Sequence, residues 1–387
     1  MGDTVARGSA ASAHNQARIV ELLRKQQTLT KQEIASQLGW SMPTTLQNIN
    51  DLIERGILQE CGELESTGGR KAKRIGLCRE AGLAVGIDAA LHHVELVLTD
   101  LTGEVRERTV LSHPFRDEPE WYRTLGNELE WFLTACGADT ARVLAAGLSF
   151  PGIIDDGAQE IVHSHIFGLQ HVSLDRFQRA IPFPLVAAND ANCACFAELS
   201  AGHASYLYVS LNESVGGALV LNHQLHLGDT CQAGEIGHML LIPGGETCYC
   251  GKQGCADAYL SPKVLRRPGQ TMAAFLRQVH AGEREACAKW DSYLTHLAVF
   301  LTNLRMMLNV DLIVGGEVGM YVKPYLETLC EKAAQYDRFA RDVDYIYPCS
   351  RTESAFAAGA AMLALEKYGS RVLERREESE DETGRDF

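Results

Sequence analysis

The sequence predicts an α/β protein in which a small basic helical domain precedes a larger acidic body with two lobes. Strand-like and helical segments alternate from residue 82 to residue 367, as expected for α/β lobes. The charge is uneven, because residues 1–79 carry a net +3 whereas the whole chain carries −14. A basic segment attached to an acidic body is typical of a nucleic-acid-binding module joined to another function.

The composition favours a soluble globular protein. The chain has 387 residues, enough for two or three domains, with 46% hydrophobic and 22% charged residues. No apolar run approaches the ~20 residues of a membrane-spanning helix, and the first residues show no apolar signal segment. We therefore expect a cytoplasmic protein with no membrane contact. Its twelve cysteines should be reduced, so that any cluster of them indicates metal binding or catalysis.

The N-terminal domain is predicted over residues 1–79 and begins with helices. Residues 17–25 have an apolar face at helical spacing. Thr30 and Glu33 have the spacing of a capping box at the start of a second helix. Ser41 can cap a third helix that ends at Gly56. Helices joined by so short a turn indicate a helix-turn-helix.

The third helix and the segment after it predict DNA binding. Residues 57–77 should form a hairpin with a basic tip, Arg70 and Lys71, which would contact phosphates as a wing. The helix is expected to expose short hydroxyl and amide side chains that can read base edges, namely Thr44, Thr45, Gln47 and Asn48. The domain is thus predicted to be a winged helix-turn-helix that binds a double-stranded operator. The alternative is a small helical bundle that makes protein contacts.

The body divides into two sets of strands and helices, with a ligand cleft expected between them. The first lobe, residues 80–200, should contain strands at 83–88, 94–100, 105–111, 143–149 and 184–188 and helices at 118–136 and 191–201. The second lobe, residues 201–350, should contain strands at 207–211, 217–221 and 311–314 and a long helix at 284–308. A C-terminal helix within 351–368 completes the first lobe, and residues 369–387 are expected to be an acidic, disordered tail.

One imidazole and three thiols lie within 18 residues and have the spacing of a closed tetrahedral zinc site. They are His238, Cys248, Cys250 and Cys255. Four protein ligands leave no position for a reactive water, so the expected zinc is structural. The alternative is a set of buried cysteines without metal, and that reading suits the scattered Cys193 and Cys195.

The chain resembles the ROK family of repressors, open reading frames and sugar kinases over about residues 12–368. The specific match is Gly234-Glu235-Ile236-Gly237-His238 followed by Cys248-Tyr249-Cys250-Gly251-Lys252-Gln253-Gly254-Cys255, which is similar to the family's zinc motif. The segment 188–192 and the turn Pro151-Gly152 match two further family motifs. The resemblance is closest to the repressor branch. It implies a winged helix-turn-helix before a two-lobed, sugar-kinase-like body of the actin/hexokinase type with a structural zinc loop.

The resemblance also implies a sugar pocket in the cleft between the lobes. The residues it assigns to sugar contacts are Gly152, His165, Asn189, Asp190, Glu235, His238 and Asp257. In the family's kinases the aspartate at the position of Asp190 is the general base. His238 would contact the sugar with one nitrogen and the zinc with the other. Asp257 stands where the family usually has glutamate.

The segments that resemble the family's phosphate-binding loops have lost their glycines and threonine. Residues 88–93 and 210–217 stand in their place, and Glu213 would bring a negative charge near the phosphates. We therefore expect no catalytic residue, and Asp190 would be a vestigial base. The expected function is a sugar-responsive repressor of carbohydrate uptake or metabolism. It is expected to act as a homodimer or homotetramer. The first alternative is a sugar kinase with an accessory DNA-binding segment. The second is a zinc-stabilised scaffold without a small ligand.

Overall fold

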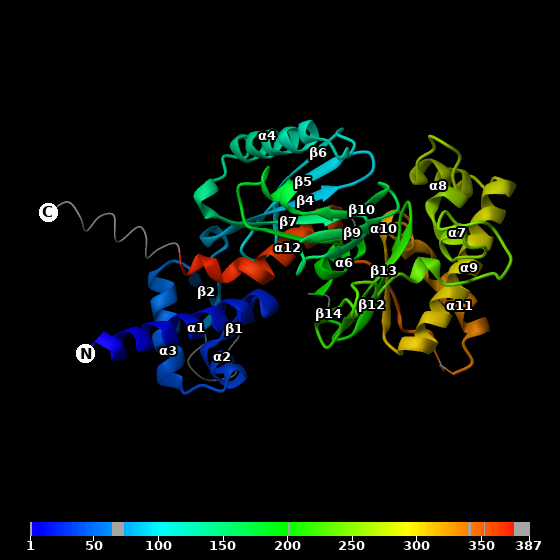
Figure 1. Cartoon of the computed structure of the whole chain (residues 1–387). Coiled ribbons are helices and arrows are strands. Elements are labelled where there is room, and N and C mark those ends of the chain that lie inside the picture. Colours follow the sequence, from blue (N-terminus) through cyan, green and yellow to red (C-terminus); the bar gives the residue numbers. More distant parts are fainter. Residues whose placement is uncertain (1, 64–72, 200–201, 340–341, 352, 375–387) are drawn as a thin grey trace.

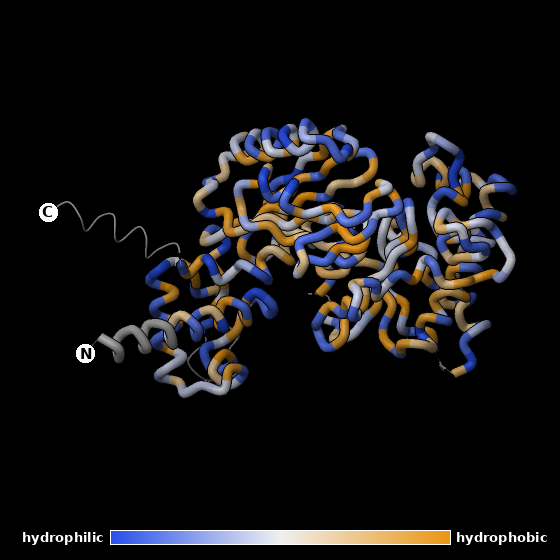
Figure 2. The backbone as a smooth tube through the Cα atoms, in the orientation of Figure 1, coloured by the Kyte–Doolittle hydropathy of each residue, from blue (hydrophilic) through white to orange (hydrophobic). Residues whose placement is uncertain are grey.

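The structure is a computed structural model that describes residues 2–63, 73–199, 202–339, 342–351 and 353–374, with side chains from residue 12 onward. A small N-terminal domain lies beside one end of a larger body of two lobes (Figure 1). Hydrophobic segments concentrate in the middle of the body (Figure 2). No helix in these ranges has the length and hydropathy needed to cross a membrane.

The N-terminal domain has the helices and the hairpin that the sequence predicts. In chain order its elements are α1 (Gly2–Gln26), β1 (Thr28–Thr30), α2 (Lys31–Leu38), α3 (Met42–Glu54), β2 (Leu58–Glu63) and β3 (Lys73–Leu77). The strands form an antiparallel sheet in the order β1-β3-β2. The capping box is present, since Thr30 accepts from the Glu33 amide and Glu33 accepts from the Thr30 amide. The Ser41 side chain caps α3 as expected.

The first lobe is built on a five-stranded sheet in the order β11-β7-β4-β5-β6. Its elements are β4 (Leu83–Ala89), β5 (Val94–Asp100), β6 (Val105–Leu111), α4 (Pro119–Ala135), β7 (Val143–Phe150), β8 (Ile153–Asp155), β9 (Glu160–Ser164), β10 (Leu169–Ser173), α5 (Asp175–Gln178), β11 (Leu185–Asn189) and α6 (Asp190–Ala197). Strands β8 to β10 make a small antiparallel sheet of their own. Helix α4 covers the outer face of the large sheet (Figure 1).

The second lobe has a five-stranded sheet in the order β14-β13-β12-β15-β16. Its elements are β12 (Tyr206–Leu211), β13 (Val215–Leu221), β14 (Gln224–His226), η4 (Ile236–His238), α7 (Asp257–Leu260), α8 (Met272–His280), α9 (Arg284–Leu308), β15 (Asp311–Gly315), α10 (Gly316–Gly319), α11 (Leu326–Tyr336) and β16 (Ile346–Pro348). Short 3₁₀ helices connect elements within the described residues, among them η1 (Arg79–Ala81), η2 (Thr140–Arg142), η5 (Pro262–Val264) and η6 (Lys323–Tyr325).

Helix α12 (Ala355–Tyr368) returns to the first lobe and packs between its sheet and α6. The backbones of α12 and its neighbours come into direct contact at glycines. A Cβ on Gly147 of β7 would lie 1.9 Å from the Ala360 carbonyl oxygen of α12. A Cβ on Gly359 would lie 1.7 Å from the Cys193 carbonyl oxygen. The sequence of α12 is rich in alanine, and these small side chains permit such close contact.

The end of α12 joins the N-terminal domain to the body. Leu365 shares a hydrophobic core with Ile19 and Leu23 of α1, and η7 (Gly369–Val372) adds Val372 to the same core. Arg24 forms an ion pair with Glu366. Arg55 donates to the Leu373 carbonyl oxygen at 2.5 Å.

The predicted C-terminal tail needs a correction at its start. Residues 369–374 are ordered and packed rather than part of a disordered tail, because Val372 and Leu373 are apolar side chains that bury against α1. Residues 375–387 lie outside the described part of the chain.

Candidate functional site

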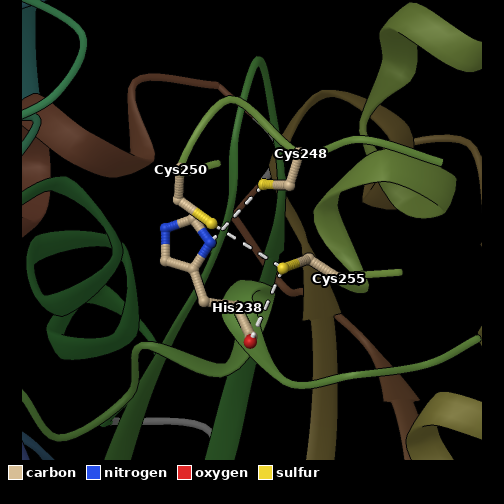
Figure 3. A group of neighbouring side chains, drawn as sticks. All are labelled: His238, Cys248, Cys250 and Cys255. Atoms are coloured by element: carbon tan, nitrogen blue, oxygen red, sulfur yellow. Dashed lines mark hydrogen bonds between the residues drawn. The ribbon is translucent and has the colours of Figure 1, made fainter. Parts of the chain in front are cut away.

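The four predicted metal ligands come together in one cluster. The ligand atoms of His238, Cys248, Cys250 and Cys255 all lie within 4.8 Å of one another. The Nδ1 atom of His238 is 3.7 Å from the Sγ atom of Cys248, and the Sγ atoms of Cys250 and Cys255 are also 3.7 Å apart (Figure 3). Metal–sulfur bonds of about 2.3 Å in a tetrahedron place the ligand atoms about 3.8 Å apart. The cluster therefore has the size and the donor set of a tetrahedral metal site.

The loop reaches this geometry through tight turns. The Gly251 amide donates to the Cys248 carbonyl oxygen at 2.9 Å, and the Cys248 amide donates to the Lys252 carbonyl oxygen at 2.8 Å. Gly254 has a φ of +90°, and a Cβ there would lie 1.8 Å from the Ile242 carbonyl oxygen. Only glycine fits at this position, which brings Cys255 beside the other ligands.

A cavity of about 260 Å³ lies between the two lobes, next to this cluster. It is bounded by the loop after β7, the β9–β10 hairpin, the start of α6, the β12–β13 turn and the segment before η4. Six of the seven residues that the sequence analysis assigns to sugar contacts line it, namely Gly152, His165, Asn189, Asp190, Glu235 and His238. The sequence positions that the resemblance groups together are thus neighbours in space.

Asn189 both caps α6 and faces the cavity. Its Oδ1 accepts from the Ala191 amide at 2.9 Å, and its Nδ2 donates to the Gly152 carbonyl oxygen at 2.9 Å. The role of helix cap, which is common for an Asn-Asp pair, is therefore real at this position. The Asn189 side chain also hydrogen-bonds the Asp190 carboxyl group, so it fixes the position of this second cavity residue.

Two carboxyl groups give the cavity its electrostatic character. Burial raises the pKa of Asp190 above its ordinary value, although the Ala191 amide opposes this shift. Burial also raises the pKa of Glu235, and the charge of Asp190 adds to the effect. The two groups can accept hydrogen bonds from adjacent hydroxyls, which is the donor arrangement of a sugar.

His238 connects the cluster to the cavity. Its Nδ1 faces Cys248, while its Nε2 lies 3.2 Å from the Oη atom of Tyr249. The ring centroids of His165 and Tyr249 are 5.7 Å apart on the same wall. Tyr249 also lines the cavity and was not among the expected contact residues, although its position between two ligand cysteines was a signal that the loop would carry it there.

Asp257 does not line this cavity. Its carboxylate is 5% exposed and accepts from the Val215 amide at 2.6 Å. The side chain is shorter than the glutamate usual in the family, and it ties the start of α7, two residues after Cys255, to the first residue of β13. Asp257 thus links the cluster to the cavity wall.

A second cavity of about 390 Å³ adjoins the first and shares Pro151, Ile166, Asp190 and Ser214 with it. It lies at the segments that the sequence analysis identifies as altered phosphate loops. Four more carboxylates line it, namely Asp88, Glu95, Glu213 and Glu317. Arg266 forms ion pairs with both Glu213 and Glu317, so it bridges the β12–β13 turn and α10.

Two backbone amides at this second cavity are occupied within the protein. The Gly316 amide donates to the Tyr208 hydroxyl at 3.2 Å. The Glu317 amide donates to the Asn212 side chain at 2.7 Å. An amide that already donates to a protein group is not available to a phosphate oxygen.

Helix α3 presents a different face from the one expected. Thr45 is fully buried and donates to the Ser41 carbonyl oxygen at 3.0 Å, and Asn48 is 5% exposed and donates to the Thr44 carbonyl oxygen at 2.8 Å. These two residues share the inward stripe of Ile49, so the expectation that they are exposed was wrong. Thr44 is half-buried, and Gln47 and Asn50 are exposed. Arg70 and Lys71 lie outside the described residues.

Two family models match the chain. The ROK family model matches residues 84–367, and a model described as winged helix-turn-helix DNA-binding matches residues 14–59. The xylose repressor of Bacillus subtilis (strain 168) is 25% identical over 316 residues, covering 78% of this chain and 81% of the relative.

Solved structures share the fold. One is a ROK family transcriptional regulator described as a homologue of the E. coli MLC protein, with a TM-score of 0.75 and 17% identity over 94% of this chain and 98% of that one. The ROK hexokinase from Thermus thermophilus has a TM-score of 0.61 and 24% identity over 74% of this chain and 99% of that one. The chain has a Cys/His cluster and a cavity between two lobes, and the ROK family model matches 284 of its residues, so the chain belongs to the ROK family.

Proposed function

We propose that this protein is a sugar-responsive, DNA-binding transcriptional regulator, a repressor of carbohydrate uptake or metabolism, and that it does not phosphorylate the sugar. The observation that carries the proposal is the position of α12. This helix packs on α6, whose first residues line the cavity, and shares a hydrophobic core with α1 of the winged helix-turn-helix domain. A ligand at α6 is therefore one helix away from the DNA-binding domain (Figure 1).

The second cavity supports the absence of kinase activity. Phosphoryl transfer needs free backbone amides and cations around the nucleotide phosphates. Here the amides of Gly316 and Glu317 are occupied, and carboxylates line the cavity. We expect no ATP-dependent phosphorylation of any sugar that binds. A turnover near the usual ~1–100 s⁻¹ of kinases, lost in Asp190→Asn, would instead support the sugar kinase alternative.

The metal cluster has a structural role in this proposal. Its three sulfur ligands and one imidazole suit Zn²⁺, and four protein ligands leave no open position for chemistry. When bound, the zinc would cross-link the loop that carries His238 and Tyr249 and so hold one wall of the cavity in place.

The DNA-binding face follows from the exposed side chains of α3. Gln47 is the one residue of the expected set Thr44, Thr45, Gln47 and Asn48 that is exposed, and Asn50 lies about one turn further along the same face. A single winged helix covers one half-site, so specific binding calls for a homo-oligomer that places two such helices about one turn of DNA apart.

Substitution of Gln47 tests this face. Gln47→Ala should weaken binding to the preferred operator by roughly 1–3 kcal/mol and relax the preference at one or two base pairs, because a base-edge contact is lost. Binding is measured by fluorescence anisotropy at fixed salt on operators selected from random DNA. Gln335→Ala, an exposed residue of α11 in the second lobe, is the matched control. Equal affinity of Gln47→Ala and the control on every operator variant would show that α3 does not read the bases.

A further inference from the structure

We infer that Arg18 of α1, stacked on the ring of Trp40, binds a backbone phosphate of operator DNA. This contact rests on the proposed DNA-binding function and lies outside the reading helix α3. Two features of the N-terminal domain support it, namely the place of Trp40 in the fold and the unused N–H groups of Arg18.

Trp40 lies in the turn between α2 and α3. Gly39 has a φ of +69°, and the Trp40 amide donates to the Ala35 carbonyl oxygen at 2.9 Å, so the turn closes against the end of α2. Ser41, the next residue, caps α3. The turn lies on the side of the domain away from α12 (Figure 1). In a helix-turn-helix the first helix crosses the DNA backbone and the second enters the major groove, so Trp40 lies between these two elements.

The side chain of Arg18 lies over this turn. Its guanidinium carbon is 5.2 Å from the centroid of the Trp40 ring, which is a cation–π contact. Trp40 is half-buried and packs against the hydrophobic core to which Ile19 of α1 belongs. An indole fixed in this way holds the planar guanidinium beside the turn.

Arg18 has no hydrogen bond or ion pair of its side chain among the described residues, and it is only half-buried. Glu21, one turn further along α1, accepts from Lys25 at 2.7 Å instead. The other lysines and arginines described between residues 12 and 77 form ion pairs or hydrogen bonds within the protein, namely Arg24, Lys25, Lys31, Arg55, Lys73 and Arg74. Arg18 is thus the basic side chain of this part of the domain that remains for an acceptor outside the protein.

A phosphate is the acceptor that suits a stacked arginine. The guanidinium is planar, keeps its charge at neutral pH and can donate two parallel N–H groups to phosphate oxygens. Stacking on the indole restricts the side chain beforehand, so less freedom is lost on binding. A phosphate contact carries no sequence information. Arg18 should therefore strengthen binding to every duplex and leave the choice of base pairs to α3.

The test is fluorescence anisotropy with the full-length, metal-loaded protein and two duplexes, an operator selected from random DNA and a shuffled duplex of the same length. Binding is measured at several KCl concentrations between about 50 and 200 mM. Arg18→Ala should weaken binding to both duplexes by about 10-fold, the size of a lost charge-assisted hydrogen bond. The slope of log K against log[KCl] should become less steep by about 0.9 for each half-site, because one phosphate contact is lost at each.

Two further variants separate a phosphate contact from a packing role. Arg18→Lys restores the charge, so it should recover the slope but only part of the affinity, since an ammonium group is not a planar fork. Arg305→Ala is the matched control. This arginine of α9 lies 4.7 Å from the ring centroid of Tyr345 in the second lobe, and its loss removes the same charge. The control should change neither affinity nor slope.

Unchanged affinity and slope in Arg18→Ala would overturn this inference and leave the DNA-binding function standing. A loss confined to the selected operator, with the slope unchanged, would also overturn it, because Arg18 would then only position α3. If Arg18→Lys has the same flattened slope as Arg18→Ala, the charge does not meet a phosphate and the inference is wrong. If the wild-type protein binds neither duplex, the DNA-binding function and this inference fail together.

Discussion

Asp88 shows what burial does to a single carboxyl group at the interface of the lobes. It is 5% exposed and accepts a hydrogen bond from the Ser149 hydroxyl at 2.7 Å. Burial raises its pKa to about 7, and the charges of Asp190 and Glu95 add to the shift while Ser149 opposes it. The folded protein therefore holds a proton on Asp88 at a pH where the unfolded chain has lost it.

We predict that Asp88→Asn flattens the pH dependence of stability. Between pH 4 and pH 7 the folded state binds more protons than the unfolded state, so wild-type stability falls as the pH rises through this window. The amide keeps an acceptor for Ser149 and cannot ionise. It should increase the free energy of unfolding at pH 8 by roughly 2–4 kcal/mol and have little effect below pH 4. Urea denaturation at pH 4, 6 and 8 measures the difference. Parallel pH profiles for the two proteins would contradict the assignment.

Sequence motifs identified which residues belong to the site. They did not show which side-chain atoms are already hydrogen-bonded within the protein. The cysteine cluster was predictable because its ligands lie close together in the chain, so their spacing alone limits the geometry. Asn189 and Asp257 were expected as sugar contacts, but their hydrogen bonds to backbone groups depend on neighbours distant in sequence. Thr45 was expected to be exposed because its polarity was given more weight than its place on the inward stripe of α3.

At the level of elements, the crossing of α6 and α12 is the tightest contact that bears on function. Gly359 permits it, because a Cβ at this position would lie 1.7 Å from the Cys193 carbonyl oxygen. The obstacle is backbone and not a flexible side chain, so the helices must separate to admit a methyl group.

Gly359→Ala is therefore expected to lower the free energy of unfolding by roughly 1–3 kcal/mol, as overpacking does in well-packed cores. Gly369→Ala is the matched control, since its φ is −60° and its Cβ would meet no atom within 4 Å. Thermal denaturation of both variants provides the comparison. A loss of stability as small in Gly359→Ala as in Gly369→Ala would show that the crossing is not tightly packed.

The loop that carries Cys248, Cys250 and Cys255 should depend on its bound metal. Cys250→Ser should lose most of the bound metal, because three ligands remain, and should weaken sugar binding through the wall that carries His238 and Tyr249. Metal content by mass spectrometry and sugar affinity by calorimetry are the two measurements. Cys287→Ser, on α9 and outside the cluster, should change neither. If Cys250→Ser has normal metal content and normal sugar affinity, the cluster neither binds the metal nor supports the cavity wall.

Long elements with a clear period were predictable, and short polar ones were not. The helix at residues 284–308 and the strands at 94–100 and 105–111 were predicted with the bounds they have in the structure. The hairpin β9–β10 was not predicted, because its two five-residue strands, EIVHS and LQHVS, are short and lack a regular alternation of apolar and polar residues. His163 and His165, which face the cavity from this hairpin, were therefore without a predicted structural context.

In the whole molecule, one continuous path of packed elements connects the cavity to the DNA-binding domain. It runs from the start of α6 to α12 and then to α1 and η7, where Arg55 holds the Leu373 carbonyl oxygen. A ligand can change DNA affinity only if it binds the arrangements of the two lobes with different affinity. The sequence predicted the two ends of this path, but not α12 as the element between them, because that role depends on tertiary contacts.

The most direct test is the operator affinity of the full-length protein with and without a saturating sugar, measured by fluorescence anisotropy at fixed salt. We predict a change of about 5- to 150-fold, the usual range of such couplings, and the same factor in sugar affinity when operator is saturating. Asp190→Ala should lose the effect of sugar on DNA affinity, because the side chain lines the cavity. If the sugar is bound in the cavity by calorimetry and the operator affinity is nevertheless unchanged, sugar sensing is not the mechanism of this protein.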